Sequence, residues 1–291
     1  MRGMVSICIC FRYDNNVARS NQRPTLAVIG GLLHMVYVGT DGSSLWWSWF
    51  DGTKWGGNVE IGSATAVNSA VATIGECGSP SMVSMNGQLY LAYHSYSEDP
   101  HDTTGSTPVP DGRGGFLPEG GHSYVLCWST VDVTKTLEAK NWSPGKVIKG
   151  QFRQPALAIS NGKIILAASG GDSSVIYANV INFAANPFNN HAWLPLELQN
   201  GAVVPKSKQG VDFATLGSTL YMAFPGEGGS NMYYASLDDS MNVFGNIQIK
   251  CTNAVPITSA PIGVVAFGNQ LALAYKGNDS DNMWFTYASP K

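Results

Sequence analysis

The feature that most constrains this chain is a cassette of alternating apolar residues and tight turns, which recurs along its length. In the first copy, at 32–55, the sequence LLHMVYVGTDGSSLWWSWFDGTKW holds two alternating runs joined by a turn rich in Gly, Asp and Ser. Alternating runs of about five to eight residues separated by such turns predict antiparallel β-hairpins. The recurrence therefore predicts an all-β repeat architecture.

One position inside the cassette sets the period. The equivalents of Val36 lie in QLYLAY, KIILAA, TLYMAF and QLALAY, and they are Ala92, Ala167, Ala223 and Ala274. The spacings are 56, 75, 56 and 51 residues, and the longest reflects an insertion. An apolar run precedes each marker strand, an aromatic-rich run follows it, and four copies add a short last run (NVEI, KVIK, LELQ, IQIK). Four strands in about 50 residues are typical of a β-propeller blade.

The fifth copy has no last run before Lys291, whereas an apolar segment, MVSICIC at 4–10, precedes the first copy. Exposed sheet edges favour aggregation, so a radial array is expected to close. We therefore predict one domain, 1–291, folded as a five-bladed β-propeller of four-stranded antiparallel blades. The blades are expected at about 24–61, 80–149, 155–199, 211–250 and 261–291, and the N-terminal strand 4–10 is expected to complete the last.

The composition predicts a weakly charged surface. Charged residues make up 13% of the chain and the net charge is −3, against roughly 25% charged residues in average domains. No basic stripe is present, so we expect no nucleic-acid partner. No apolar run reaches the roughly 18–20 residues of a transmembrane helix, so we expect no membrane insertion.

The N-terminus, MRGMVSICICFRYDNN, has too short an apolar run for a classical signal peptide and lacks a small-residue cleavage site. The five cysteines are scattered and odd in number, which does not indicate a disulfide framework. We expect a protein that is cytoplasmic or secreted by a non-classical route, without a cofactor, and leave a homo-oligomer open.

Aromatic residues form two columns in the third strands of the blades. Alternation puts Trp47 on one face of its strand and Trp46 on the other. The Trp47 column is wholly aromatic and is expected to pack between blades: Trp128, Tyr177, Tyr234 and Phe285. The Trp46 column is more variable and is expected to be exposed at some blades as a stacking surface: Cys127, Ile176, Tyr233 and Trp284.

The turn before the third strand is polar in four copies: GTDGSS at 39–44, GGDSS at 170–174, GEGGSN at 226–231 and GNDSDN at 277–282. These are ordinary turn residues, but polar acceptors beside an aromatic ring are also what a sugar requires. Both interpretations stay open. The second gives these candidate ligand-binding residues: Asp41, Trp46, His94, Asp172, Asn231, Tyr233, Asp279, Asp281 and Trp284.

The second blade carries the insertion, rich in Gly and Pro, at 95–123. Loops this long are usually functional or mobile. Three of the five histidines lie in or beside it (His94, His101 and His122), but no HxH or HxxxH spacing indicates a metal site. We favour a solvated cover over a pocket or over the central opening.

A glycosidase would need two carboxyl groups facing the central channel. In the five runs expected to be innermost, Asp212 is the one acidic residue, and Glu76 lies shortly before another run. The segment SWFDGTKW differs from the sialidase repeat S-x-D-x-G-x-T-W, the six arginines form no evident cluster, and no GxSxG, Walker or HExxH motif is present. We therefore expect no enzyme and assign no catalytic residue.

The cassettes NGQLYLAY…WSTVD, LAYKGNDSDNMWF and SWFDGTKW resemble β-propeller lectins, both the tachylectin-like type and the fungal and bacterial lectins that bind N-acetylglucosamine or fucose. The resemblance covers essentially the whole chain. It implies multivalent sugar binding without metal, in pockets between neighbouring blades. The Arg/Glu pair of one fucose-binding type is absent, and the repeats diverge more than in tandem lectins.

The expected function is accordingly a lectin with several inter-blade sugar pockets and no catalysis, whose partners are glycans or glycoproteins. Two alternatives stay open. The first is a protein-interaction scaffold, or a toxin or defence module, that uses the ring face or the 95–123 loop. The second is a glycoside hydrolase.

Overall fold

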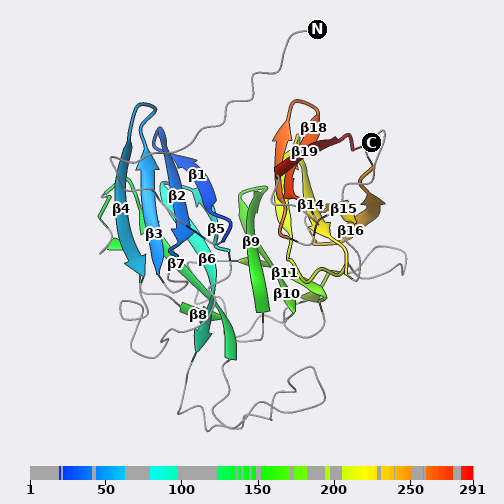
Figure 1. Cartoon of the computed structure of the whole chain (residues 1–291), viewed down its shortest axis with the longest axis horizontal. Helices are drawn as coiled ribbons and strands as arrows, with labels where there is room; N and C mark the ends of the chain where they lie inside the picture. Colours follow the sequence, from blue (N-terminus) through cyan, green and yellow to red (C-terminus); the bar gives the residue numbers. More distant parts are fainter. Residues whose placement is uncertain are drawn as a thin grey trace.

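The computed structural model contains strands and turns, and it confirms the predicted all-β class (Figure 1). It describes residues 20, 22–40, 44–62, 79–97, 123–135, 137–138, 141–143, 146–148, 152–170, 174–181, 194–196, 205–227, 231–238, 240–250, 258, 260–277 and 283–290. The predicted closing strand 4–10 lies outside these residues, as does most of the 95–123 insertion.

The described residues form five separate antiparallel sheets, and each follows the chain from one strand to the next. The first strands of the sheets are β1 (Thr25–Ile29), β5 (Ser81–Met85), β9 (Phe152–Ser160), β13 (Asp212–Leu216) and β17 (Gly263–Phe267). The second strands are β2 (Leu32–Val38), β6 (Gln88–Ser97), β10 (Lys163–Gly170), β14 (Thr219–Pro225) and β18 (Gln270–Lys276). The third strands are β3 (Leu45–Phe50), β7 (Ser123–Asp132), β11 (Ile176–Ile181), β15 (Met232–Leu237) and β19 (Met283–Ala288). The fourth strands are β4 (Trp55–Gly62), β8 (Lys146–Ile148), β12 (Leu194–Pro195) and β16 (Val243–Gln248).

The first and second strands of each sheet are joined by two-residue turns. In Asn86-Gly87 and Asn161-Gly162 both residues have positive φ, at 52° and 81° and at 48° and 71°. Two positive φ angles in succession define the type I′ turn, whose twist matches that of the strands it joins. The Asn-Gly dipeptides therefore fix the register of these hairpins.

In four sheets the residue that pairs with the marker is the predicted member of the Trp47 column, and in the third sheet it is not. Val36 pairs with Trp47, and the corresponding marker residues pair with Trp128, Tyr234 and Phe285. In the third sheet, however, Ala167 pairs with Ala178, and Tyr177 lies opposite Ala168. Tyr177 therefore belongs to the other column, because the sequence alignment of this blade was one residue out of register.

The insertion is also shorter than the sequence suggests. Strands β6 and β7 each run for ten residues, and Ser97 pairs with Ser123 at their far end. The ladder thus includes 95–97, which belong to the predicted insertion.

Neighbouring sheets pack face to face, and one apolar cluster fills each interface. The four clusters join the first sheet to the second, the second to the third, the third to the fourth and the fourth to the fifth. Trp47 is fully buried in the first of these interfaces, and its ring lies edge-on to Trp142 at 5.5 Å. Its predicted packing role is confirmed.

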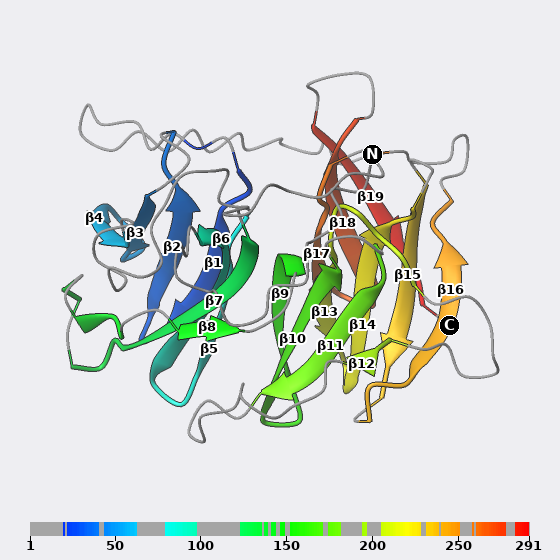
Figure 2. The same ribbon diagram turned by 90° about the horizontal axis from the view of Figure 1, so that it is seen from below.

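Among the described residues, no such cluster joins the fifth sheet to the first (Figure 2). The two faces left without a partner are apolar, and residues of both line one cavity. Phe285 lies in this region and is 67% exposed, whereas the sequence predicts that it packs between blades. We refer to these two faces as the seam, which comprises Leu26, Val28, Val265, Phe267, Phe285 and Tyr287.

Candidate functional site

A cavity of about 680 Å³ lies between the first strands of all five sheets. Residues of β1, β5, β9, β13 and β17 all line it. Its volume falls in the range of roughly 300–1,000 Å³ that is usual for small-molecule sites. The first strands therefore surround a central space large enough for a ligand.

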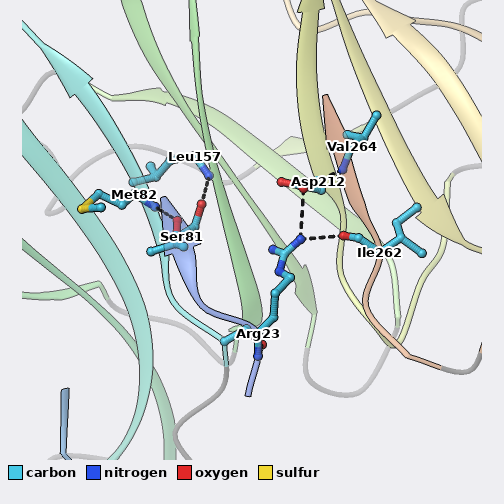
Figure 3. Close-up of polar contacts among 9 residues, drawn as sticks. Arg23, Ser81, Met82, Leu157, Asp212, Ile262 and Val264 are labelled. Carbon is cyan, nitrogen blue, oxygen red and sulfur yellow. Dashed lines mark hydrogen bonds and ion pairs between the residues drawn. The ribbon is translucent and has the colours of Figure 1, made fainter. Parts of the chain in front are cut away.

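The residues paired with the marker in the five first strands occupy equivalent positions, and four of them line one end of this cavity: Thr25, Ser81, Asp212 and Gly263. Three of these residues are polar, and each accepts a hydrogen bond from a backbone N–H of the next sheet (Figure 3). The contacts are Met82 N to Thr25 Oγ1 at 2.8 Å, Leu157 N to Ser81 Oγ at 2.8 Å, and Val264 N to Asp212 Oδ2 at 3.0 Å. These bonds hold the starts of neighbouring first strands together, so side chains at this end converge on one opening.

The two remaining positions of this set are Ala156, which pairs with Ala167, and Gly263, which pairs with Ala274. Neither has a side chain that can accept a hydrogen bond. A Cβ built on Gly263 would lie 4.0 Å from Asp212 Oδ2, which is ordinary contact distance. On the side of Asp212 that faces the fifth sheet, the cavity wall therefore has no side chain at Gly263.

Arg23 crosses the seam at the same end of the cavity. Its Nη1 lies 3.0 Å from Asp212 Oδ2 and donates a hydrogen bond to the carbonyl oxygen of Ile262 at 2.5 Å. Its backbone N–H donates to Ser79 Oγ at 3.1 Å. One side chain that precedes β1 thus links the first sheet to the fourth and the fifth, as Figure 3 shows.

Arg23 and Asp212 are the charged residues among the described residues that line the cavity. The Arg23 guanidinium and the Val264 amide both contact Oδ2 of Asp212, and Figure 3 shows the other carboxylate oxygen turned away from Arg23. Such a carboxylate can accept a proton or a sugar hydroxyl while its position is held by the first oxygen. This is the one acid–base group that the described part of the cavity supplies.

Sequence reasoning found Asp212 but missed Arg23. Asp212 is the one acidic residue in the runs expected to be innermost, whereas no motif or repeat position includes Arg23. The partner of Arg23 is 189 positions away along the chain, so only the folded structure brings the two together.

The candidate ligand-binding residues derived from the sequence lie elsewhere. Trp46 and Tyr233 are partly buried in third strands of different sheets, His94 is buried in β6, and Trp284 is 51% exposed on β19. The Tyr233 ring stacks on Phe224 at 5.9 Å and covers Gly226, where a Cβ would come within 2.7 Å of the ring.

None of the described candidates lines the central cavity, and those just named occupy four different sheets. Asn231 is partly buried just before β15. The remaining candidates lie outside the described residues: Asp41, Asp172, Asp279 and Asp281. The assignment of these residues to sugar binding stays a prediction.

Two further findings bear on the site. Within the ranges that the structure describes, no group of three or more His, Cys, Asp or Glu side chains is placed to hold a metal ion. No helix in the same ranges is long and apolar enough to cross a membrane.

Comparison with known proteins shows similarity in structure without similarity in sequence. No protein-family model matches the chain, and no curated protein matches it. Similar solved structures include the GH43_1 enzyme from Xanthomonas citri complexed with xylose, with a TM-score of 0.60 and 12% identity over 91% of this chain and 85% of that one. The RS223 β-xylosidase has a TM-score of 0.58 at 10% identity, over 91% and 90% of the two chains. The exo-β-1,3-galactanase from Phanerochaete chrysosporium with galactose has a TM-score of 0.61 at 7% identity, over 91% and 58%.

These neighbours confirm the β-propeller fold and contradict the predicted lectin function. The similar solved structures are glycoside hydrolases, so the expectations of a lectin and of a non-enzyme are wrong. Turns and aromatic strands specify a blade, and the same blade serves lectins and hydrolases, so these features do not distinguish the two functions. At this level of identity the likeness concerns the fold, and a function has to be argued from the cavity.

Proposed function

We propose that this protein is a glycoside hydrolase whose substrate binds in the central cavity, at the end that holds Arg23 and Asp212. The observation that carries the proposal is a carboxylate held on the wall of a ligand-sized cavity between the five sheets. The similarity in fold to β-xylosidases and a galactanase supports the reaction class. Glycans are accordingly the proposed partners.

Asp212 is proposed as the general base or nucleophile of the reaction. Glycoside hydrolysis uses one carboxylate in that role and one protonated carboxyl group as the acid. Arg23 is proposed as a positioning residue, because its contact with Oδ2 fixes the carboxylate while the other oxygen stays available. The second carboxyl group is not among the described residues that line the cavity, so this proposal assigns one half of the acid–base pair.

The test is hydrolysis of a panel chosen from the substrates named for the similar structures: aryl β-xyloside, aryl α-arabinofuranoside, xylotriose and β-1,3-galactan. Asp212→Asn is the informative variant, because its amide oxygen can still accept the hydrogen bond from Val264 N–H. We expect it to retain the fold and to lose hydrolysis by about a hundredfold or more.

Asp51→Asn is the matched control. Asp51 is exposed and its carboxylate only caps the turn that contains Thr53 and Lys54. Its substitution should leave hydrolysis unchanged. A wild-type protein that binds these glycans without cleaving them, or an Asp212→Asn variant with full activity, would overturn the proposal.

We also propose that the ring has five blades and that residues 4–10 form the fourth strand of the fifth sheet. Among the described residues β19 has no strand beyond it. Phe244 and Ile247 of β16 are exposed on the side of the fourth sheet that packs against the fifth. A strand added beside β19 would cover both side chains, which supports this closure.

A homo-oligomer, and a location in the cytoplasm or outside the cell by a non-classical route, stay predictions of the sequence.

A further inference from the structure

Three aromatic rings form a continuous row on the face of the fifth sheet that belongs to the seam. Phe285 and Tyr287 have ring centroids 6.2 Å apart, and Tyr287 and Phe267 have centroids 6.4 Å apart. Their side chains are 67%, 37% and 66% exposed in the order Phe285, Tyr287 and Phe267. We refer to Phe285, Tyr287 and Phe267 as the aromatic row. Exposed apolar surfaces of this kind usually mark a binding site or an interaction surface.

The strand register explains why the row stays uncovered from within its own sheet. Phe285 on β19 pairs with Ala274 on β18, which pairs in turn with Gly263 on β17. Tyr287 pairs with Ala272, which pairs with Val265. Small residues beside the rings leave the aromatic faces open. This face therefore has Phe285 and Tyr287 on β19 and Phe267 at the end of β17, with small residues on β17 and β18 opposite Phe285.

These small residues extend to the end of the cavity that holds Asp212. Gly263, Ala274 and Phe285 all line the central cavity, and so does Val265. The Cβ position of Gly263 is 4.0 Å from Asp212 Oδ2. A path over Gly263 and Ala274 thus connects the Asp212 carboxylate with the ring of Phe285, over about 10 Å at the usual spacing of two strand separations.

We propose that the aromatic row binds consecutive sugar rings of a glycan chain whose terminal residue occupies the central cavity. The inference rests on the proposed function for the position of that terminal residue, and it specifies the substrate class as an oligosaccharide or polysaccharide. The apolar C–H faces of sugar rings stack on exposed aromatic faces, and the Tyr287 hydroxyl adds a hydrogen-bonding group. The chain lies over Gly263 and Ala274 and leaves the protein along the seam.

The competing occupant of the aromatic row is the first sheet itself. Leu26 and Val28 are exposed on the opposite face of the seam, and Leu26 lines the same cavity as Phe285. If the two faces close on each other, the aromatic rings are packing residues. In that case their removal lowers stability and leaves glycan binding unchanged.

The experiment measures binding of xylan and β-1,3-galactan by affinity gel electrophoresis, and hydrolysis of the same polymers and of their aryl monosaccharides. For Phe285→Ala and Phe267→Ala we expect polymer binding to weaken by about tenfold each. Phe285→Tyr, which keeps a ring, should restore binding.

Trp284→Ala is the matched control, because Trp284 lies on the same strand as Phe285, has a comparable exposure of 51% and points to the opposite face. The aromatic row predicts wild-type polymer binding for this variant, whereas the sequence-based assignment of Trp284 to sugar binding predicts a loss. Loss of binding in Trp284→Ala with none in Phe285→Ala overturns the inference. A lower melting temperature in Phe285→Ala with unchanged polymer binding also overturns it, and favours closure of the seam.

The design separates the failure of this inference from that of the proposed function. If the wild type cleaves aryl glycosides but the row variants bind polymer normally, the aromatic row is not a glycan site although the hydrolase assignment stands. If nothing is cleaved but the row variants lose polymer binding, the stacking site stands and the hydrolase assignment fails. A wild type that binds neither polymer overturns the stacking site.

Discussion

Arg23 Nη1 lies 3.0 Å from Asp212 Oδ2, and this ion pair joins the residue two positions before β1 to the first residue of β13. Both side chains are about three-quarters buried, and the guanidinium also satisfies the Ile262 carbonyl. The contact combines charge with hydrogen bonding in a partly desolvated place, where it is worth more than an ion pair on an open surface.

Replacing Arg23 by Met should therefore destabilise the protein. The change removes two contacts of one donor group and leaves Asp212 with the Val264 amide alone, so we expect a loss of about 1–3 kcal/mol in the free energy of unfolding. For a chain of this size that corresponds to a decrease of several degrees in Tm, roughly 2–4 °C per kcal/mol. Differential scanning calorimetry measures it. Lys135→Met removes an exposed ion pair with Asp132 and should have little effect; equal effects of the two variants would contradict the assigned role of Arg23.

Ser81→Ala tests the hydrogen bonds that link neighbouring first strands. Ser81 Oγ accepts a hydrogen bond from the N–H of Leu157, and both residues are buried. Loss of the acceptor leaves a buried donor unsatisfied, so we expect a cost of about 1–3 kcal/mol by urea denaturation. Ser84→Ala, which removes an exposed hydrogen bond to the Val28 carbonyl, is the control and should cost less than about 0.5 kcal/mol. The role of Ser81 is refuted if both variants have the same midpoint.

Deletion of residues 1–10 tests the proposed closure of the ring. The fourth strand of the fifth sheet would be lost, and Phe244 and Ile247 would stay exposed, so we expect destabilisation by about 3 kcal/mol or more. Deletion of 1–3 leaves the proposed strand intact and should unfold as the wild type does. A normal melting transition after deletion of 1–10 would show that this strand closes nothing.

The pH dependence of stability should report on His34. Burial lowers the pKa of His34 to about 4, against about 6.5 in an unfolded chain. The neutral ring also accepts a hydrogen bond from Trp47 Nε1 at 3.2 Å, which a protonated Nδ1 could not do. Between these two pKa values the unfolded state binds more protons than the folded one.

Stability contributed by His34 is accordingly complete above pH 6.5 and is lost as the pH falls from 6.5 toward 4. The slope reaches at most about 1.4 kcal/mol per pH unit. Chemical denaturation from pH 7.5 to 4 measures it, and His34→Gln should flatten the curve over that interval. A curve of unchanged slope in His34→Gln would assign the acid sensitivity to other groups.

The blade pattern could be predicted from the sequence because it depends on local information. Alternation, Asn-Gly turns and the repeated marker together specify which residues pair within a sheet, from Val36 with Trp47 to Ala274 with Phe285. The predicted register of the third sheet is wrong by one residue, because its third strand, IYANVI, has a single aromatic residue by which to align it.

The candidate site depends on contacts between blades, and a repeat pattern does not reveal these. Arg23 precedes a strand and matches no motif. Asp212 occupies the same position in its blade as the polar residues Thr25 and Ser81, so the repeat pattern does not single it out. The sequence does not predict the exposure of Phe285 either, because the same column contains the buried Trp47. What distinguishes the two residues is the presence or absence of a neighbouring sheet, which is a property of the assembled ring.

Four of the five equivalent positions line the end of the cavity, and one of these, Gly263, has no functional group. Gly263 has the contact distances of ordinary packing around a Cβ and no positive φ, so a side chain can be added there without backbone strain. Each position belongs to a different blade, so its residue can be substituted separately. Gly263→Asp would place a second carboxyl group in the cavity wall beside Asp212, and the scaffold thereby offers a means of installing or redesigning a catalytic pair.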